Sequence, residues 1–186
     1  QHYSGSTVCA PSRSVLMTGQ HTGHARVRGN GKGTHLLDED VTVAEVLKSV
    51  GYTTGCIGKW GLGSEKDAGA PWDQGWDFYF GFLNQTNAHH YYPEFLWKNN
   101  EKIPYPDNPE KRTHYAHDLF TDEALNFIRE NKDEKFFLYL PYTIPHVDLD
   151  VPEDSKEPYL GKMGEEKPYG TPGGQHYRHE PNPRAT

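Results

Sequence analysis

The alternation of apolar and polar positions predicts three helices. A run from Cys9 to Gly19 contains a proline that suits the first turn of a helix, and it closes on a glycine. A capping box over 42–45 starts a second helix, which Gly51 ends, and a third helix covers 118–131. Apolar side chains at helical spacing form the expected packing faces of the last two, Val43, Val46, Leu47 and Val50 in one and Phe120, Ala124, Phe127 and Ile128 in the other.

Apolar runs of another kind predict strands. Residues 52–57 are rich in β-branched and aromatic side chains, 71–82 give an aromatic turn and strand, and 135–142 are a continuous apolar run typical of a central strand covered on both faces. Residues 97–112 are polar and contain prolines, which predicts an insertion or a β-hairpin on the rim. Helices that alternate with strands indicate an α/β sheet.

Composition narrows the class of protein. The 186 residues suffice for one domain with a real core, and a hydrophobic content of 34% with 13% aromatic residues suits a polar, loop-rich enzyme. A net charge of -7 argues against a nucleic-acid partner, since binding to phosphates needs a basic face. No apolar run reaches the ~18 residues of a membrane span. Because the chain begins with Gln1 rather than Met, we expect an internal piece of a longer protein.

Two loop regions carry weaker patterns. The glycine-rich stretch 20–33 contains His21 and His24 with three basic residues, and it is either a polyanion site or a solvated loop. The spacing of these histidines resembles that of metal ligands, but without further ligands it is weak evidence for zinc. The stretch 151–186, rich in Pro, Gly, Lys and Glu, is expected to be a long surface excursion.

The most informative stretch surrounds Cys9. This residue lies at the N-terminus of the first predicted helix, where free N–H groups and the positive end of the helix dipole hold tetrahedral anions. Arg13 follows about one turn later on the same face and offers a planar set of donors for sulfate or phosphate oxygens. An anion pocket is therefore indicated. The alternative is a cysteine that only packs, because free cysteines are often buried and inert.

The segment Cys9-Ala10-Pro11-Ser12-Arg13, followed by Leu16-Met17-Thr18-Gly19, resembles the signature of the formylglycine-dependent sulfatases, the type I or arylsulfatase-like family. The resemblance implies an α/β fold with the mixed sheet of alkaline phosphatases and sulfatases, flanked by helices. It also implies that 1–186 is an incomplete catalytic domain, without the N-terminal metal-binding segment and the C-terminal part. In this family a formylglycine-generating enzyme oxidises the cysteine that matches Cys9, and the hydrated aldehyde supplies the nucleophilic oxygen. Cys9 would then not pair with Cys56.

A lysine follows the predicted strand 52–57, in Gly58-Lys59-Trp60-Gly61-Leu62-Gly63. Glycines allow a sharp turn that carries an ammonium group into the cleft where open α/β sheets bind ligands, although a lone loop lysine is usually solvated. The block resembles the sulfatase sequence Gly-Lys-Trp-His-Leu-Gly, whose lysine contacts the sulfate and matches Lys59. Gly61 stands where many members carry a histidine that assists breakdown of the sulfated intermediate.

Two histidines complete the candidate site. The segment Ala88-His89-His90-Tyr91-Tyr92-Pro93 resembles one found in sulfatases with Gly-Lys-Trp-Gly-Leu-Gly, so that His89 matches their active-site histidine. The alternative is an exposed pair of loop histidines. His146 follows Pro145 after the buried run 135–142, a position suited to chemistry in an α/β sheet. It resembles the histidine of the family's Pro-His block, which contacts the sulfate ester and assists the leaving group. A structural histidine is the alternative.

Together these matches imply a sulfuric ester hydrolase that cleaves a sulfate monoester on a small molecule or a glycan. Arg13 and Lys59 would hold the sulfate oxygens, and His146 with His89 would handle protons. The family usually binds calcium through oxygen ligands, of which only the modified Cys9 is present, so we expect weak metal binding and little turnover from the 186 residues alone. The family's usual export implies a periplasmic or extracellular protein.

Two other functions remain open from the residues. One is a phosphate or phosphonate monoester hydrolase of the same superfold, whose more highly charged substrate demands more positive charge in the site. The other is a non-catalytic binder of sulfated glycans, in which Cys9 stays a thiol.

Overall fold

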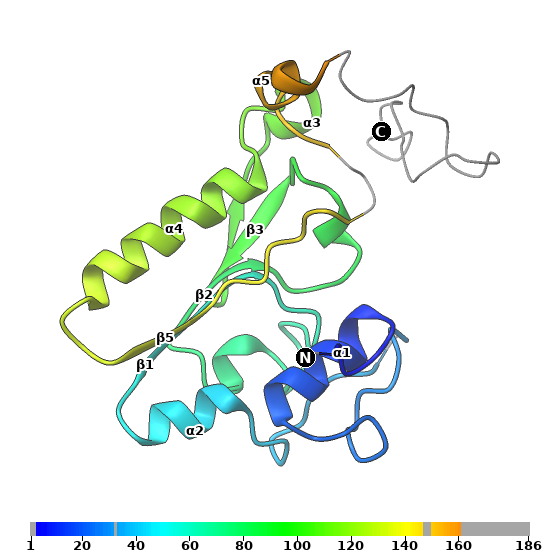
Figure 1. The fold of residues 1–186 in the computed structure, drawn as a ribbon, viewed down its shortest axis with the longest axis vertical. Helices are drawn as coiled ribbons and strands as arrows, with labels where there is room; N and C mark the ends of the chain where they lie inside the picture. Colours follow the sequence, from blue (N-terminus) through cyan, green and yellow to red (C-terminus); the bar gives the residue numbers. More distant parts are fainter. Residues whose placement is uncertain (1–2, 32, 147–149, 161–186) are drawn as a thin grey trace.

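A mixed sheet forms the centre of the molecule. The computed structural model describes residues 3–31, 33–146 and 150–160, and within them five strands lie in the order β4-β3-β2-β1-β5 (Figure 1). Their bounds are Thr53–Lys59 for β1, Phe78–Phe82 for β2, Phe95–Lys98 for β3, Glu101–Pro104 for β4 and Phe136–Tyr139 for β5. Strands β2, β1 and β5 run parallel, whereas β3 and β4 are antiparallel. The predicted mixed α/β architecture is confirmed.

Helices cover both faces of this sheet. Their bounds are Cys9–Thr18 for α1, Val43–Ser49 for α2, Asn108–Lys111 for α3, Ala116–Asn131 for α4 and Glu153–Lys156 for α5. Figure 1 shows α1 and α2 on one side of the sheet and the long helix α4 on the other. None of the helices in the described residues is long and apolar enough to cross a membrane.

Two apolar clusters fill the space between the helices and the sheet. Cys56 of β1 lies in the cluster under α1 and α2, whereas its neighbour Ile57 lies in the cluster under α4. This alternation follows from the opposite directions of successive side chains in a strand. Phe120 and Ala124 bring α4 onto the second cluster, as predicted.

Three apolar residues predicted to pack are exposed. Val46 and Val50 are 53% and 61% exposed, because α2 ends at Ser49 and turns Ala44 rather than Val46 toward the sheet. Ile128 is 38% exposed, because it follows Phe127, which already contacts the first residues of the strands. Helical spacing predicted the packing face of α4 largely correctly, whereas the predicted face of α2 is only partly right, because Ala44 is the buried residue of that helix.

The predicted central strand lies elsewhere in the sheet. Strand β5 pairs with β1 and stands at the end of the described strand order, so the prediction of a central position is wrong for this part of the chain. Both of its faces are nevertheless covered, since Phe137 and Tyr139 pack on one cluster and Phe136 and Leu138 on the other. An apolar run reports burial and carries no information about strand neighbours.

Peripheral segments complete the fold. Strands β3 and β4 form the hairpin that was one of the two predictions for the polar stretch, although it begins earlier, at Phe95. Residues 151–160 are mostly exposed, as expected for a surface excursion. The rest of that prediction, 161–186, lies outside the described residues, as does Lys32 of the glycine-rich loop.

Candidate active site

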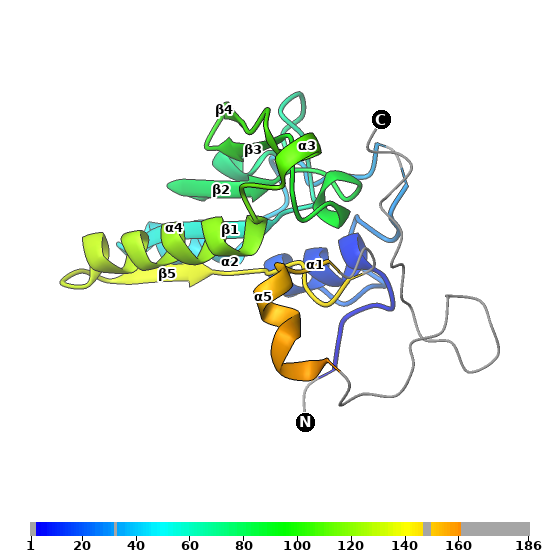
Figure 2. The ribbon, with the colours of Figure 1, turned by 90° about the horizontal axis from the view of Figure 1, so that it is seen from above.

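Three of the predicted site residues follow three adjacent parallel strands. Lys59 ends β1, His89 lies on the short turn Asn87–His89 after β2, and His146 follows β5. Because the carboxyl ends of parallel strands meet at one edge, these residues share the edge where open α/β sheets bind ligands. Figure 2 shows α1, which begins at Cys9, beyond the arrowhead of β5 at this edge.

The end of β1 is fixed by backbone contacts on both sides. Gly58 has φ +131°, and a Cβ there would collide with the carbonyl oxygen of Pro141. The next residue, Lys59, donates its backbone N–H to the same oxygen at 3.0 Å, and Trp60 donates to Phe82 at 2.9 Å. Glycine is therefore required at position 58, and the lysine backbone is held between β2 and the segment after β5.

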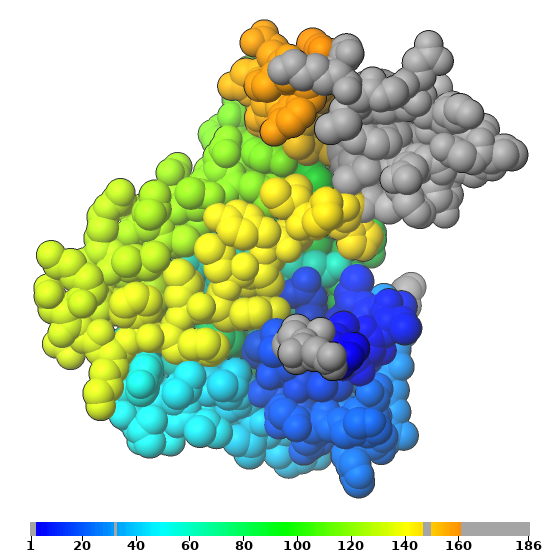
Figure 3. All heavy atoms as spheres, viewed as in Figure 1, coloured from blue at the N-terminus to red at the C-terminus, as the bar shows by residue number. Residues whose placement is uncertain are grey.

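Cys9, Arg13 and Lys59 form one group. Arg13 Nη1 donates to the Lys59 carbonyl oxygen at 2.6 Å and lies 3.4 Å from the hydroxyl of Tyr139, which ties α1 to β1 and β5. Figure 3 shows the same neighbourhood from outside, with the blue segment of α1 against the yellow segment that follows β5. The Nε atom of Arg13 is buried and has no hydrogen-bond partner among the described residues.

Lys59 is a buried cation, with 2% of its surface exposed. Burial lowers the pKa of its ammonium group, the Cys9 sulfur with which it hydrogen-bonds raises it, and the nearby charge of Arg13 lowers it. Two cationic side chains that lie close together with little solvent around them repel each other, and a nearby anion relieves that repulsion. The electrostatics of this group therefore favour an anionic ligand beside Cys9.

His89 and His146 form the second group. Their imidazole rings are stacked, with centroids 4.1 Å apart and planes 16° from parallel. His146 closes a turn in which its backbone N–H bonds to the Thr143 carbonyl oxygen at 3.1 Å. The fold thus brings together two histidines that are far apart in the sequence. An imidazole group can in general donate or accept a proton near neutral pH.

Gly61 shows how the chain fills the space beside the lysine. Its φ is +76°, and a Cβ there would collide with the carboxamide of Gln85, whose Nε2 donates to the Gly61 carbonyl oxygen at 3.2 Å. The Oε1 atom of Gln85 is buried and has no hydrogen-bond partner within the described part of the chain. The space that a side chain at position 61 would enter thus holds the Gln85 carboxamide.

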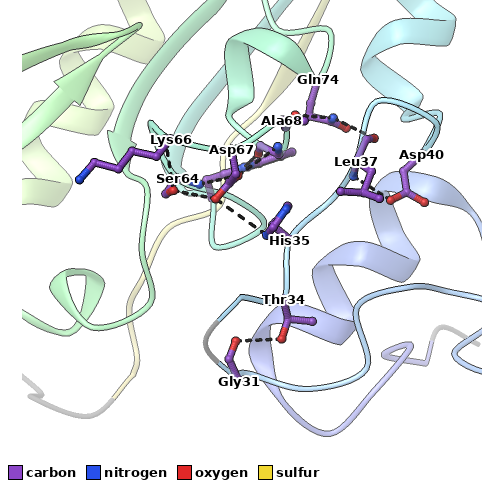
Figure 4. A network of polar contacts seen from close by, with 12 residues as sticks. Gly31, Thr34, His35, Leu37, Asp40, Ser64, Lys66, Asp67, Ala68 and Gln74 are labelled. Atoms are coloured by element: carbon purple, nitrogen blue, oxygen red, sulfur yellow. Dashed lines mark hydrogen bonds and ion pairs between the residues drawn. The ribbon is translucent and has the colours of Figure 1, made fainter.

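A polar network supports the loop that follows Lys59. Asp67 accepts hydrogen bonds from the backbone N–H groups of Ser64 and Gly69 and from the Ser64 hydroxyl, and its carboxylate lies 3.9 Å from His35 Nδ1 (Figure 4). Serine, histidine and aspartate meet here, but Ser64 donates directly to the carboxylate, so this is not the arrangement of a nucleophilic serine. Trp60 Nε1 donates to the Gly69 carbonyl oxygen at 2.7 Å, which ties the loop to the residue after Lys59.

The described residues of the glycine-rich loop are mostly exposed, and one of them, Asn30, contacts the site. Arg26 forms ion pairs of 3.6 Å with Glu39 and Asp40, and Arg28 donates to backbone carbonyl oxygens of its own loop. These charges are already engaged, which disfavours the polyanion site. Asn30 Oδ1 accepts the backbone N–H of Ala10 at 2.9 Å and so caps the first turn of α1.

The described residues do not fit a calcium site. No group of three or more His, Cys, Asp or Glu side chains gathers within them, whereas calcium takes about six to eight oxygen ligands. His21 and His24 therefore belong to no metal cluster in this part of the chain. Cys9 and Cys56 are both free thiols, so they do not form a disulfide.

Some site contacts were not predictable from the sequence. Tyr139, Asn30 and Gln85 contact the site from other elements, and no spacing in the chain relates them to Cys9 or Gly61. The burial of His117, a residue of α4, could have been predicted from the sequence. It lies three residues before Phe120 and seven before Ala124, and this helical spacing places it on the same buried face. The predicted start of that helix at residue 118 left it out.

Comparison with known proteins decides the family. The family model described as Sulfatase matches residues 1–177. The chain belongs to the sulfatase family. It is 34% identical over 175 residues to an arylsulfatase of Hemicentrotus pulcherrimus, covering 82% of this chain and 31% of that protein. It is 28% identical over 185 residues to N-acetylgalactosamine-6-sulfatase of Homo sapiens, covering 86% of this chain and 34% of that protein. The chain spans about a third of the length of such relatives.

Solved structures show the same fold in other sulfatase-family proteins. The structure of Ps i-CgsB has a TM-score of 0.71 and 26% identity, with 85% of this chain and 39% of that chain covered. The structure of BT4656 in complex with its substrate D-glucosamine-2-N,6-O-disulfate has a TM-score of 0.60 and 25% identity. The match covers 77% of this chain and 26% of that chain. The predicted family and its sheet architecture are therefore confirmed.

Proposed function

We propose that the protein containing this chain is a sulfatase that hydrolyses a sulfate monoester, and that residues 1–186 are part of its catalytic domain. One observation carries the proposal: Cys9 lies at a helix N-terminus beside two cations, the half-buried Arg13 and the buried Lys59. A sulfate ester is an anion whose oxygens need such cations. Family membership supports sulfate as that anion.

The two cations would bind and orient the ester. Arg13 offers the positive charge of a guanidinium held against the Lys59 backbone, and Lys59 offers an ammonium group that already points toward the Cys9 sulfur. Converted to formylglycine and hydrated, Cys9 would supply the nucleophilic oxygen. The neighbouring Lys59 ammonium would favour ionisation of a hydroxyl at that position, because positive charge stabilises an oxyanion.

The histidine pair would handle the proton of the leaving group. An alkoxide is a poor leaving group in water, so cleavage needs an acid near the ester oxygen. His146 and His89 are stacked at the same sheet edge as Lys59, and either ring can carry that proton. We assign His146 to the leaving group and His89 to the substrate-binding wall beside it.

The substrate would be a sulfated glycan or a sulfated small molecule. Relatives include N-acetylgalactosamine-6-sulfatase, N-acetylglucosamine-6-O-sulfatase and arylsulfatases, and one structural neighbour is a complex with a neocarrahexaose. These names favour sulfate esters over phosphate esters and over a binder without catalysis. Calcium, a formylglycine-generating enzyme as maturation partner and an exported location belong to the same proposal and rest on the resemblance to the family.

Parallel assays of sulfate and phosphate esters test the proposal. The complete protein, produced together with a formylglycine-generating enzyme, is assayed with an aryl sulfate, the matching aryl phosphate and sulfated glycan oligosaccharides. We expect turnover of at least one sulfate ester, with the phosphate ester slower. Faster cleavage of the phosphate would favour a phosphohydrolase, and binding of a sulfated glycan without turnover of any ester would favour a non-catalytic binder.

A further inference from the structure

The turn that carries His146 is held by two side chains from outside it. His117, on α4, has its Nε2 atom 2.7 Å from the Thr143 hydroxyl and accepts the backbone N–H of Ile144 at 3.2 Å. Tyr91 places its hydroxyl 2.9 Å from the His146 carbonyl oxygen and 3.3 Å from that of Thr143. Within the described residues, these contacts connect the turn to His117 and to Tyr91.

These contacts determine which nitrogen of the His117 ring carries the proton. Because Nε2 accepts the N–H of Ile144, it carries no proton, so the Thr143 hydroxyl donates to it and the ring proton is on Nδ1. Burial lowers the pKa of His117 to about 4, which keeps the ring neutral near pH 7. His117 can thus act as an acceptor for the turn in any ordinary buffer.

Core packing alone does not account for a histidine at this position. His117 is 5% exposed and lies against the aromatic rings of Tyr91, Phe120 and Tyr142. Its Nδ1 atom has no hydrogen-bond partner among the described residues. A buried N–H without a partner destabilises a core in which a phenyl ring would pack without that cost.

Apolar burial does not fix the turn either. The Ile144 side chain is 45% exposed, and the His146 N–H bonds to the Thr143 carbonyl oxygen within the turn. A shift of Thr143 therefore moves His146 and separates its ring from His89. Thr143 itself is contacted by the Nε2 atom of His117 and by the Tyr91 hydroxyl.

We propose that His117 is a positioning residue for the candidate active site: it fixes the backbone of the turn over residues 143–146 and so holds the His146 ring against His89. The role of His146 in proton transfer, which this inference deepens, rests on the proposed function. His117 itself touches neither the substrate nor the reacting atoms.

Two substitutions separate positioning from packing. His117→Phe keeps an aromatic ring but removes the acceptor, whereas His117→Gln puts an amide oxygen near the place of Nε2. In the complete, formylglycine-containing protein we expect His117→Phe to lower kcat about 10- to 100-fold with KM changed about 2-fold or less, as for a group displaced from its reacting geometry. His117→Gln is expected to restore most of kcat. Phe127→Leu, which alters the same core away from the turn, is the control and should leave kcat unchanged.

A double-mutant cycle tests whether the effect passes through His146. In a His146→Ala background, His117→Phe should cause no further loss of kcat, because the residue that it positions is gone. An equal loss in both backgrounds would overturn the proposal, as would wild-type kcat in His117→Phe.

Crystal structures of the wild type and His117→Phe give a readout that needs no activity. The proposal predicts that residues 143–146 move and that the His89–His146 stack opens in the variant, and an unchanged turn would refute it. If the wild type cleaves no sulfate ester, the proposed function fails, but this structural comparison still tests the positioning.

Discussion

Lys59 is held by backbone contacts at the end of the sheet, whereas the turn that carries His146 is held by side chains from outside it. The Lys59 backbone bonds to the segments that flank β1, and glycine at position 58 makes that close approach possible. His146 lies on a turn in which the Ile144 N–H donates to His117 and the His146 carbonyl oxygen accepts from Tyr91. The two groups therefore depend on different side-chain contacts, but the segment after β5 is common to both, since Pro141 accepts the Lys59 N–H and His146 lies five residues further on.

Lys59→Met is expected to have the largest effect on catalysis. It removes a buried ammonium group but keeps the length of the side chain, so the anion loses one of its two cations. We expect kcat/KM for a sulfate ester to fall about 10²- to 10³-fold, the loss typical of one preorganised charge-stabilising group. Lys98→Met, on the far hairpin strand where the lysine pairs with Glu123, is the control and should change kcat/KM little. Similar losses in both variants would contradict a specific role for Lys59.

Gly58→Ala is expected to disrupt the close packing of β1 against the segment that follows β5. A Cβ at this position collides with the backbone of Pro141 and occurs at φ +131°, so β1 or the segment after β5 must move. We expect the free energy of unfolding to fall by about 3 kcal/mol, measured by urea denaturation. Gly29→Ala is the control, since nothing lies within 4 Å of its Cβ position. Equal stability of the two variants would mean that the close approach does not constrain β1.

Acidification should weaken the support from His117. The folded-state pKa of this ring is about 4, below its usual value of 6.5, so the unfolded chain binds the proton first as the pH falls. The stability that depends on this group is therefore complete above about pH 6.5 and is lost between that pH and about 4, by about 3 kcal/mol at most. Urea unfolding at several pH values measures the loss. His117→Phe should remove this part of the pH dependence, and an unchanged pH profile in the variant would contradict the assignment.

What the sequence could predict was mostly local. The capping box at Thr42, the helix that begins at Cys9 and the hairpin on the rim follow from neighbouring residues, and the structure has all three. The place of β5 in the sheet and the exposure of Val46 depend on what packs against them, which no local pattern records.

The candidate site shows the same limit. The family resemblance selected Cys9, Lys59, His89 and His146 one by one, because each lies in a short motif. The supporting contacts join elements that are distant along the chain, such as Arg13 to Tyr139 and His117 to Ile144, so only a folded structure could reveal them.

Mass spectrometry of the peptide that contains Cys9 tests the central claim most directly. The complete protein is produced together with a formylglycine-generating enzyme, and the same sample is assayed for sulfate ester hydrolysis, with Cys9→Ala as the control. Oxidation of the thiol to an aldehyde lowers the peptide mass by roughly 18 Da. We expect this loss in the active protein and no hydrolysis by Cys9→Ala. An intact Cys9 thiol in protein that hydrolyses sulfate esters at full rate would contradict Cys9 as the source of the nucleophile.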